Sequence, residues 1–162
     1  ILDIGAWCGT WSMAMQKYAN EMYCYEPNRT HFECLIKNLE SYDNVKLFNH
    51  AVGNQDGKIK LTEESATQNT RVVLETGDTV ICKIDSMDTA GADMLKIDVE
   101  GLEMEVLKGA GKILDGVECI MIELNNNSKK YGSSNSSIEK YLKELGFEIL
   151  IKTWPDIVYI KS

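Results

Sequence analysis

The sequence has 162 residues, enough for one domain with a core, since a domain of about 150 residues removes about 70% of its unfolded chain's surface from solvent. Its 25 acidic and 17 basic residues give a net charge of −8, and no segment combines clustered Lys and Arg with aromatic residues. Nucleic acid is therefore not an expected partner, because its phosphate backbone is bound by basic surfaces. A membrane is not expected either, because no apolar run approaches the roughly 18 residues of a membrane span.

The first half of the chain predicts alternating strands and helices. Short apolar runs are typical of buried strands, and apolar residues at i, i+3, i+4 and i+7 are typical of helices. In chain order we predict a strand at 1–4, a helix at 10–19, a strand at 22–25, a helix that Asn28 caps, and a strand at 45–52. This order predicts a parallel sheet with right-handed crossovers. Because the chain begins inside the first strand, the sequence leaves open whether further elements or a targeting signal precede Ile1.

The second half predicts a hairpin and the rest of the sheet. Residues 58–62 and 79–84 alternate polar and apolar side chains, so we expect them to pair beside the functional site. Further along we predict a strand at 94–98, a helix from Leu102 to Leu114 and a strand at 119–124. A loop at 125–137 follows, and then a helix that starts at a Ser136-x-x-Glu139 capping box and ends at Gly146. Two strands, at 147–152 and 157–160, close the chain. The predicted fold class is α/β, one domain over residues 1–162 with a seven-stranded, mostly parallel sheet and an antiparallel C-terminal hairpin.

Five cysteines are spread along the chain: Cys8, Cys24, Cys34, Cys82 and Cys119. None forms a C-x-x-C pair, and four of them lie within apolar strand or helix patterns. An odd count without short spacings argues against a disulfide framework and a structural zinc site. We therefore expect reduced, buried thiols in a cytoplasmic protein.

Two glycines directly follow the first predicted strand. Gly5 and Gly9 come after Ile1-Leu2-Asp3-Ile4, and helical spacing starts behind them. Glycine lets a turn adopt conformations closed to other residues and lets a ligand approach main-chain N–H groups. The loop predicts a cofactor cradle, although glycine follows strands for purely structural reasons in many α/β proteins.

An acidic residue stands where a ribose ligand is expected. Glu26 follows the second predicted strand, and the carboxyl ends of the first two strands of a doubly wound sheet are neighbours, so we expect Glu26 beside the glycine loop. The spacing D-x-G-x-x-x-G lacks the close glycine pair of pyrophosphate-binding loops, which favours S-adenosylmethionine over a nicotinamide dinucleotide. The closing antiparallel strand favours the same choice, since it is typical of class I methyltransferases.

Four blocks of residues follow one another over most of residues 1–124. They are Asp3-Ile4-Gly5-Ala6 with Gly9, Tyr25-Glu26-Pro27 with Leu35 and Asn38, Ala51-Val52-Gly53 with Gly57, and Leu95-Lys96-Ile97-Asp98-Val99-Glu100-Gly101 with Glu103. In this order they resemble the FkbM family of S-adenosylmethionine-dependent methyltransferases. The resemblance implies a Rossmann-like class I methyltransferase fold and O-methylation of a sugar or other small molecule. Trp7 departs from the pattern, because the family usually has asparagine after the Gly-Ala pair.

The resemblance also implies which residues hold S-adenosylmethionine. It assigns the methionine end to Asp3, Gly5, Ala6 and Gly9, the ribose to Glu26, and the border of the adenine to His50, Ala51 and Val52. Asn28 either assists at the ribose or only caps its helix. Because a lone histidine at a strand end is more often structural than catalytic, we do not expect His50 to act as a catalyst.

Three carboxylates at strand ends are candidates for a catalytic base. Asp98 and Glu100 leave the strand at 94–98, and Glu123 lies in the strand at 119–124. Methyl transfer to a hydroxyl requires alignment of the nucleophile with the methyl group, and a nearby carboxylate can accept the hydroxyl proton. We expect Asp98 to be the base, with Glu100 and then Glu123 as the alternatives. The structural alternative is that Glu100 only stabilises a helix N-terminus and Asp98 only orients a loop.

The same strand ends offer oxygen ligands to a metal ion. Asp98, Glu123 and Asn125 would suit Mg²⁺ if they converge, and some O-methyltransferases use this ion to polarise a hydroxyl. Spacing alone does not establish convergence. The expected cofactor is therefore S-adenosylmethionine without Mg²⁺.

Two polar loops, at 63–78 and 125–137, are long for a compact domain. Loops of that length often bind ligands, so we expect them to form the pocket for a small-molecule acceptor such as a carbohydrate, with contacts from Arg71, Lys129, Lys130 and Tyr131. The alternative is that they are surface segments without a binding role. At the level of function, a nicotinamide-dependent oxidoreductase and a cofactor-binding module without turnover remain the alternatives, and the sequence does not indicate an oligomeric state.

Overall fold

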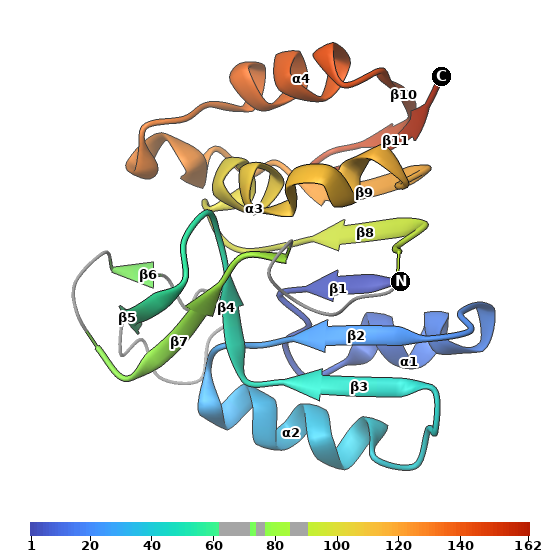
Figure 1. Cartoon of the computed structure of the whole chain (residues 1–162), viewed down its shortest axis with the longest axis vertical. Coiled ribbons are helices and arrows are strands. Elements are labelled where there is room, and N and C mark those ends of the chain that lie inside the picture. The colour runs from blue at the N-terminus through green and yellow to red at the C-terminus, as the bar shows by residue number, and fades with distance from the viewer. Residues whose placement is uncertain (62–71, 74–76, 85–90) are drawn as a thin grey trace.

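The computed structural model describes residues 1–61, 72–73, 77–84 and 91–162, which form two sheets and the helices around them (Figure 1). The seven-stranded large sheet has the order β10-β11-β9-β8-β1-β2-β3 and contains β1 (Leu2–Ile4), β2 (Met22–Tyr25), β3 (Val45–Phe48), β8 (Met94–Ile97), β9 (Cys119–Glu123), β10 (Phe147–Thr153) and β11 (Asp156–Lys161). The four-stranded small sheet has the order β4-β7-β5-β6 and contains β4 (His50–Val52), β5 (Gly57–Leu61), β6 (Val72–Val73) and β7 (Thr79–Cys82).

The large sheet confirms the predicted topology. β1 pairs in parallel with β2 and β8, and the parallel pairing continues outward to β3 and β9. β11 is antiparallel to both β9 and β10, so the C-terminal hairpin places its second strand between them. The carboxyl ends of the parallel strands therefore meet at one end of the sheet, beside which Figure 1 shows the small sheet.

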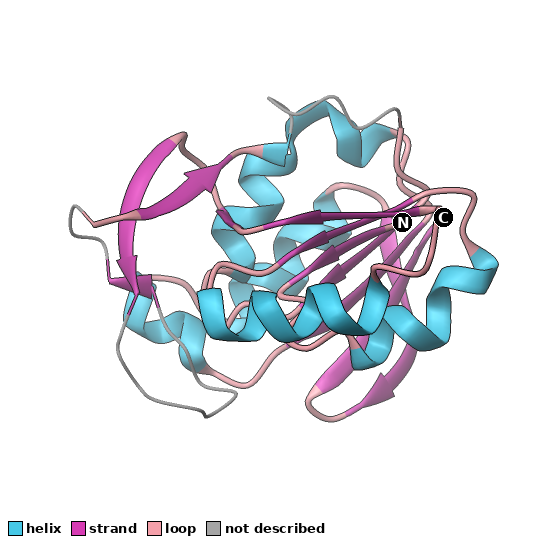
Figure 2. Ribbon diagram, turned by 90° about the horizontal axis from the view of Figure 1, so that it is seen from below, coloured by secondary structure: helices cyan, strands magenta, loops and turns pink. Residues whose placement is uncertain are grey.

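Helices lie on both sides of the large sheet (Figure 2). They are α1 (Thr10–Met15), α2 (Arg29–Leu39), α3 (Glu103–Ala110) and α4 (Asn135–Glu144), with short 3₁₀ helices η1 (Gln16–Tyr18), η3 (Gly111–Asp115) and η4 (Asn127–Tyr131). Successive side chains of β2 point to opposite faces of the large sheet. Met22 and Cys24 pack in a cluster with α1 and α2 on one face, and Tyr23 and Tyr25 belong to the larger cluster with α3 and α4 on the other. Among the described helices, none is long and apolar enough to cross a membrane.

The prediction of one continuous strand at 45–52 is wrong. The chain leaves the large sheet after Phe48, and His50 begins β4, which pairs in parallel with β7 of the small sheet. Asn49 lies at the break, and its side-chain amide donates to the carbonyl oxygens of Glu26 and Pro27 at 2.8 and 3.1 Å. These bonds anchor the break to the end of β2, so the two apolar halves enter different sheets. The predicted pairing of 58–62 with 79–84 is confirmed, because β5 and β7 are antiparallel.

Of the two helix N-caps that the sequence predicts, the structure confirms the one at Asn28 and contradicts the one at Ser136. Asn28 caps α2 as expected, since its Oδ1 accepts from the backbone N–H groups of Thr30 and His31. The predicted capping box at Ser136 is wrong: Ser134 is the N-cap of α4, and its side chain and that of Ser137 exchange bonds with each other's backbone N–H groups. The predicted loop at 125–137 accordingly contains η4 and the first residues of α4.

All five cysteines lie within the described residues and are free thiols, as expected. The expectation that they are buried holds only for Cys24, which packs under α1, while the other four are partly exposed. Apolar neighbours in the sequence do not ensure burial, because a strand or helix at the rim of a sheet buries only part of its surface.

Candidate active site

A cavity of about 420 Å³ lies at the carboxyl ends of β1, β2 and β8, between the large sheet and the small sheet. Most of the residues predicted for the site line it: Gly5, Glu26, His50, Ala51, Val52, Asp98, Glu100 and Glu123. The remaining predicted residues, Asp3, Ala6, Gly9 and Asn28, are not among those that line it. The structure adds lining residues that the sequence did not single out, among them Thr10, Tyr25, His31 and Asn127.

The glycine loop closes tightly over the end of β8. Gly5 has φ +82°, and a Cβ at this position would lie 1.8 Å from the carbonyl oxygen of Asp98, so only glycine fits. The backbone N–H groups of Gly5 and Ala6 both donate to the carbonyl oxygen of Tyr25, at 2.9 and 3.0 Å. These two amides are thus bonded within the protein. Gly9 also has a positive φ, +84°, and packs against Leu35 of α2.

Asp3 lies under the loop, fully buried, and holds two partners. It accepts a hydrogen bond from the Ser12 hydroxyl, and its Oδ1 lies 3.2 Å from Nζ of Lys96. Lys96 also lies 3.4 Å from Oδ2 of Asp98 and donates to the carbonyl oxygen of Gly5 at 2.8 Å. Burial opposes its charge, but the two carboxylates outweigh burial and raise the pKa of Lys96. Lys96 therefore ties the glycine loop to the end of β8, a role that the sequence analysis missed.

Glu26 is buried at the rim of β2 with both carboxylate oxygens occupied. Oε2 accepts from the backbone N–H of Trp7 at 2.9 Å, and Oε1 accepts from the backbone N–H of Asn28 at 2.8 Å. Burial raises the pKa of Glu26 to about 7, against the lowering effect of these two bonds. The predicted position beside the glycine loop is confirmed, because the Trp7 amide belongs to that loop.

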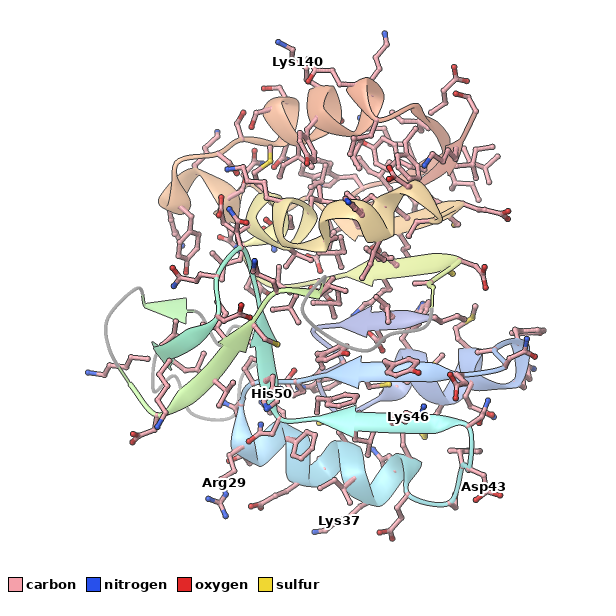
Figure 3. The ribbon with its side chains drawn as sticks, viewed as in Figure 1. Arg29, Lys37, Asp43, Lys46, His50 and Lys140 are labelled. Carbon is pink, nitrogen blue, oxygen red and sulfur yellow. The ribbon has the colours of Figure 1, made fainter. Side chains whose placement is uncertain are left out.

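Two aromatic residues complete this end of the cavity. Nδ1 of His31 lies 3.6 Å from Oε1 of Glu26, and burial lowers the pKa of His31. The Trp7 ring contacts the His31 ring edge-on, with 6.3 Å between their centres. Trp7 has φ +50°, a left-handed conformation that bulky residues rarely adopt and asparagine adopts more readily. His50 stands at the junction between β3 and β4 (Figure 3), where its ring lies 6.3 Å from that of Phe48.

The opposite end of the cavity holds three carboxylates, Asp98, Glu100 and Glu123, and the amide side chain of Asn125 joins the last two. Asn125 donates from Nδ2 to Glu100 at 3.1 Å and to Glu123 at 3.2 Å, and Asn127 donates to the same Glu100 oxygen at 2.7 Å. Burial raises the pKa of Glu123 to about 7, and its hydrogen bond with Asp98 and the nearby charges add to the rise. Glu123 is therefore a carboxyl that can accept a proton near neutral pH, with Asp98 as its neighbour.

The orientation of the Asn125 amide argues against the metal site considered at Asp98, Glu123 and Asn125. It turns its nitrogen, not its oxygen, toward Glu100 and Glu123, whereas a metal ligand presents oxygen. In the part of the chain that the structure describes, no group of three or more His, Cys, Asp or Glu side chains is placed to hold a metal ion.

Among the described residues, the predicted acceptor contacts do not line the cavity. Lys129 and Lys130 lie in η4 with exposed side chains, and neither lines the cavity. Tyr131 packs over Gly101, where a Cβ would lie 2.6 Å from its ring. Asn127 is the η4 residue that lines the cavity. Arg71 lies outside the described residues.

Comparison with known proteins agrees with this geometry. A family model described as "Methyltransferase FkbM domain" matches residues 3–149. The hexuronic acid methyltransferase AglP of Haloferax volcanii is 24% identical over 131 residues, 76% of this chain and 54% of that protein. The crystal structure of the methyltransferase FkbM from Methylobacillus flagellatus KT superposes with a TM-score of 0.72 at 16% identity, over 98% of this chain and 42% of that one. Magnesium protoporphyrin IX methyltransferase from Synechocystis PCC 6803, with bound S-adenosylmethionine, superposes with a TM-score of 0.59 at 12% identity, over 99% and 69%.

The chain spans about half the length of the first two of these proteins. These methyltransferase structures superpose on nearly the whole chain, and its large sheet is mostly parallel with β11 antiparallel near the end, which confirms the predicted class I methyltransferase fold. Since the family match covers residues 3–149, the chain belongs to the FkbM methyltransferase domain family.

Proposed function

We propose that this chain binds S-adenosylmethionine and transfers its methyl group to a hydroxyl oxygen of a small-molecule acceptor. The observation that carries the proposal is a division of one cavity: Glu26 lies at the end of β2, and the Asp98–Glu123 pair lies two to three strands away, at the ends of β8 and β9. A ribose requires an acceptor for its hydroxyl groups, and a hydroxyl nucleophile requires an acceptor for its proton. Membership of the FkbM family supports both assignments.

The residues around the glycine loop fit this cofactor. Glu26 would bind the ribose, and the loop with Asp3, Gly5, Ala6 and Gly9 would hold the methionine end, with Asp3 acting from below through Ser12 and Lys96. Asn28 serves its helix as a cap, so its side-chain oxygen is engaged there.

The adenine side of the cavity fits as well. The small-sheet residues His50, Ala51 and Val52 would border the adenine, since all three line the cavity. Tyr25 also lines it, and its buried hydroxyl has no hydrogen-bond partner among the described residues, which a ligand would supply.

The Asp98–Glu123 pair would accept the acceptor's proton. When bound, S-adenosylmethionine supplies an electrophilic methyl group: the acceptor oxygen bonds to the methyl carbon, and the carbon–sulfur bond breaks with its electrons going to sulfur. Asp98 lies 3.4 Å from Nζ of Lys96, whereas burial raises the pKa of Glu123 to about 7. A base works best with a pKa near the working pH. We therefore assign the proton to Glu123, with Asp98 beside it, and we assign Glu100 to positioning Asn125 and Asn127.

The reaction proposed here runs without Mg²⁺. The orientation of Asn125 and the raised pKa of Glu123 favour proton transfer over metal binding at these strand ends. Activity that persists in metal-free buffer with a chelator supports this assignment, and activity that is lost with the chelator and returns with Mg²⁺ overturns it.

The acceptor is proposed to be an uncharged hydroxyl compound such as a neutral sugar. The described lining contains four carboxylates, Glu26, Asp98, Glu100 and Glu123, but neither Lys nor Arg. An anionic acceptor would meet like charges there. The related AglP methylates a hexuronic acid, so a neutral glycoside and its uronide form a matched pair of test acceptors. We expect methylation of the neutral member to be faster; faster methylation of the uronide would contradict this assignment.

Calorimetry and turnover together test the proposed function. We expect binding of S-adenosylmethionine and S-adenosylhomocysteine and none of NAD, followed by methylation of a member of a hydroxyl-acceptor panel. Binding without turnover on any acceptor would favour a cofactor-binding module, and binding of NAD in their place would favour an oxidoreductase. Two further points stay predictions: that nucleic acid is not an acceptor, and that the protein is cytoplasmic. RNA should be included in the acceptor panel to test the first.

A further inference from the structure

His31 is a buried side chain of the cavity wall that has no role in the proposed function. It lies in the first turn of α2, is 8% exposed, and lines the cavity together with Glu26. Among the described residues, neither nitrogen of its ring has a hydrogen-bond partner. Nδ1 lies 3.6 Å from Oε1 of Glu26, which is too long for a direct bond. Buried polar groups are nearly always hydrogen-bonded, so this ring is available to a ligand in the cavity.

Asn28 and Trp7 hold the imidazole beside the carboxylate. The backbone N–H of Asn28 donates to Oε1 of Glu26 at 2.8 Å, and its side-chain Oδ1 accepts from the backbone N–H of His31 at 3.2 Å. The Trp7 ring contacts the imidazole edge-on, and the Trp7 backbone N–H donates to Oε2 of Glu26. The same two residues thus fix both groups, so the imidazole and the carboxylate face the cavity as a preformed pair.

The carboxylate determines which nitrogen of the imidazole carries the proton. Burial lowers the pKa of His31, so the ring is neutral at pH 7 and has one N–H donor and one acceptor nitrogen. A lone pair on Nδ1 would face the lone pairs of Oε1 of Glu26. The neighbouring oxygen therefore favours the tautomer with its proton on Nδ1, which places an N–H donor beside an acceptor.

The gap between Nδ1 and Oε1 suits a hydroxyl group. One oxygen atom can lie about 2.8 Å from both atoms, accepting from Nδ1–H and donating its own proton to Oε1. Each oxygen of Glu26 already accepts one backbone N–H, and a carboxylate oxygen has two lone pairs, so each has one left for a hydroxyl proton. The two neighbouring hydroxyls of a ribose therefore match two acceptors and, at Oε1, one additional donor.

We propose that His31 is a second ribose-binding residue, whose Nδ1–H donates to the ribose hydroxyl oxygen that donates its own proton to Oε1 of Glu26. The inference rests on the proposed function, since it concerns the same cofactor. It makes His31 a specificity residue, because an analogue without that hydroxyl leaves both the imidazole and Oε1 short of a partner. The structural alternative is that the ring only packs against Trp7, and it predicts no dependence on a ligand hydroxyl.

Calorimetry with S-adenosylhomocysteine and its 2′-deoxy and 3′-deoxy forms tests this contact in the wild type, His31→Phe and His31→Asn. Phenylalanine keeps a ring beside Trp7 but has no donor, so we expect the dissociation constant for S-adenosylhomocysteine to rise about three- to tenfold. Asparagine can place an amide nitrogen near the position of Nδ1 and should recover most of that loss. For the deoxy form that lacks the shared hydroxyl, the wild type and His31→Phe should bind equally, whereas the other deoxy form should keep the difference.

Thr30→Val is the matched control, because it removes a hydroxyl from an exposed residue of the same helical turn that does not line the cavity. It should bind all three ligands like the wild type, and circular dichroism checks that each variant folds. Equal affinity of the wild type and His31→Phe for S-adenosylhomocysteine overturns the inference and leaves the proposed function standing. A loss in His31→Phe that is the same for all three ligands overturns it too, because the ring then acts by packing. A wild type that binds no S-adenosylhomocysteine overturns the proposed function and this inference with it.

Discussion

The two ends of the cavity hold carboxylates, Glu26 buried and Glu123 partly buried, whose pKa values are raised to similar values by different surroundings. At one end, both oxygens of Glu26 accept backbone N–H groups, which oppose the effect of burial. At the other end, Glu123 is bonded to the side chains of Asn125 and Asp98, and the neighbouring acids add to the effect of burial. The pKa is about 7 in both cases, but only Glu26 is fixed by main-chain atoms.

Under the proposed function, this difference suits Glu26 to binding the cofactor and Glu123 to accepting a proton. A carboxylate held by two backbone amides keeps its position when a ligand arrives, which suits the recognition of ribose hydroxyls. A carboxylate held by side chains and paired with a second acid can gain and release a proton with small rearrangements. We therefore expect changes at the Glu26 end to appear in cofactor affinity and changes at the Glu123 end to appear in turnover.

The largest effect is expected at the reacting end. Glu123→Gln removes the proposed base, and general-base catalysis contributes about 10² to 10⁴ in rate. We therefore expect kcat to fall by about that factor while the affinity for S-adenosylmethionine stays near that of the wild type. Single-turnover kinetics and calorimetry measure the two quantities. Glu118→Gln, an exposed acid just before β9, is the matched control. A large loss of cofactor affinity in Glu123→Gln would mean that the two ends are not separate.

The pH profile sharpens the same test. Burial and the neighbouring acids raise the pKa of Glu123 to about 7, and a base acts only when deprotonated. For the wild type saturated with S-adenosylmethionine, where the titration of Glu26 no longer alters cofactor binding, kcat should therefore rise as the pH increases through about 7 and then level off. In Glu123→Gln the rise through this range should be absent. A wild-type profile that is flat from pH 6 to pH 8 would argue against a carboxyl base with this pKa.

The binding end should respond with a smaller change in affinity. In Glu26→Gln the charge is lost, and the new amide group faces a backbone N–H that needs an acceptor. Hydrogen bonds to a charged group are worth about 1.5 to 3 kcal/mol, so the dissociation constant for S-adenosylmethionine should rise about 10- to 100-fold. Isothermal calorimetry measures it, with Glu21→Gln on the surface as the control. An unchanged constant would remove Glu26 from the ribose.

The two ends also differ in what the sequence could predict. Glu26 was found because its place depends on one strand, one turn and the adjacent glycine loop, all close along the chain. The large sheet followed from local apolar patterns in the same way. Lys96 was missed because the reason for a lysine within an apolar strand lies in its two partners, Asp3 and Asp98. Asp98 follows at the end of the same strand, but Asp3 belongs to β1, which only the fold brings beside Lys96. The break at Asn49 was missed for a similar reason, since it depends on carbonyl groups of Glu26 and Pro27.

A third carboxyl with a raised pKa, Glu103, is expected to affect the stability of the fold. It is buried at the start of α3, and burial raises its pKa to about 7, with Glu100 and Asp98 adding to the rise. A carboxyl whose folded pKa is raised contributes stability that is present at acidic pH and is lost as the pH rises through about 7. Glu103→Gln stays neutral and can still accept from the Gly101 N–H, so we expect a gain on the order of 1 kcal/mol at pH 8 and little change at pH 5.

Urea unfolding at several pH values measures this effect. Glu105→Gln in the same first turn is the control, because Glu105 is ion-paired with Lys108 at 2.9 Å and should show no such gain. Equal pH dependence in the wild type and Glu103→Gln would show that another group is responsible, with Glu26 the first to examine.

The smallest effect is expected from Trp7, at the binding end. Trp7→Asn keeps the backbone N–H that Glu26 accepts and relieves a left-handed conformation that costs most residues about 1 kcal/mol, at the loss of the edge-on contact with His31. Unfolding should therefore show a stability equal to or slightly above that of the wild type, and calorimetry a far smaller loss of cofactor affinity than in Glu26→Gln. Trp7→Gly relieves the same backbone without adding an amide, so a difference between the two variants isolates the asparagine side chain. A loss of affinity as large as that of Glu26→Gln would show that the indole ring itself contacts the cofactor, and that this end of the cavity binds through side chains as well as through main-chain atoms.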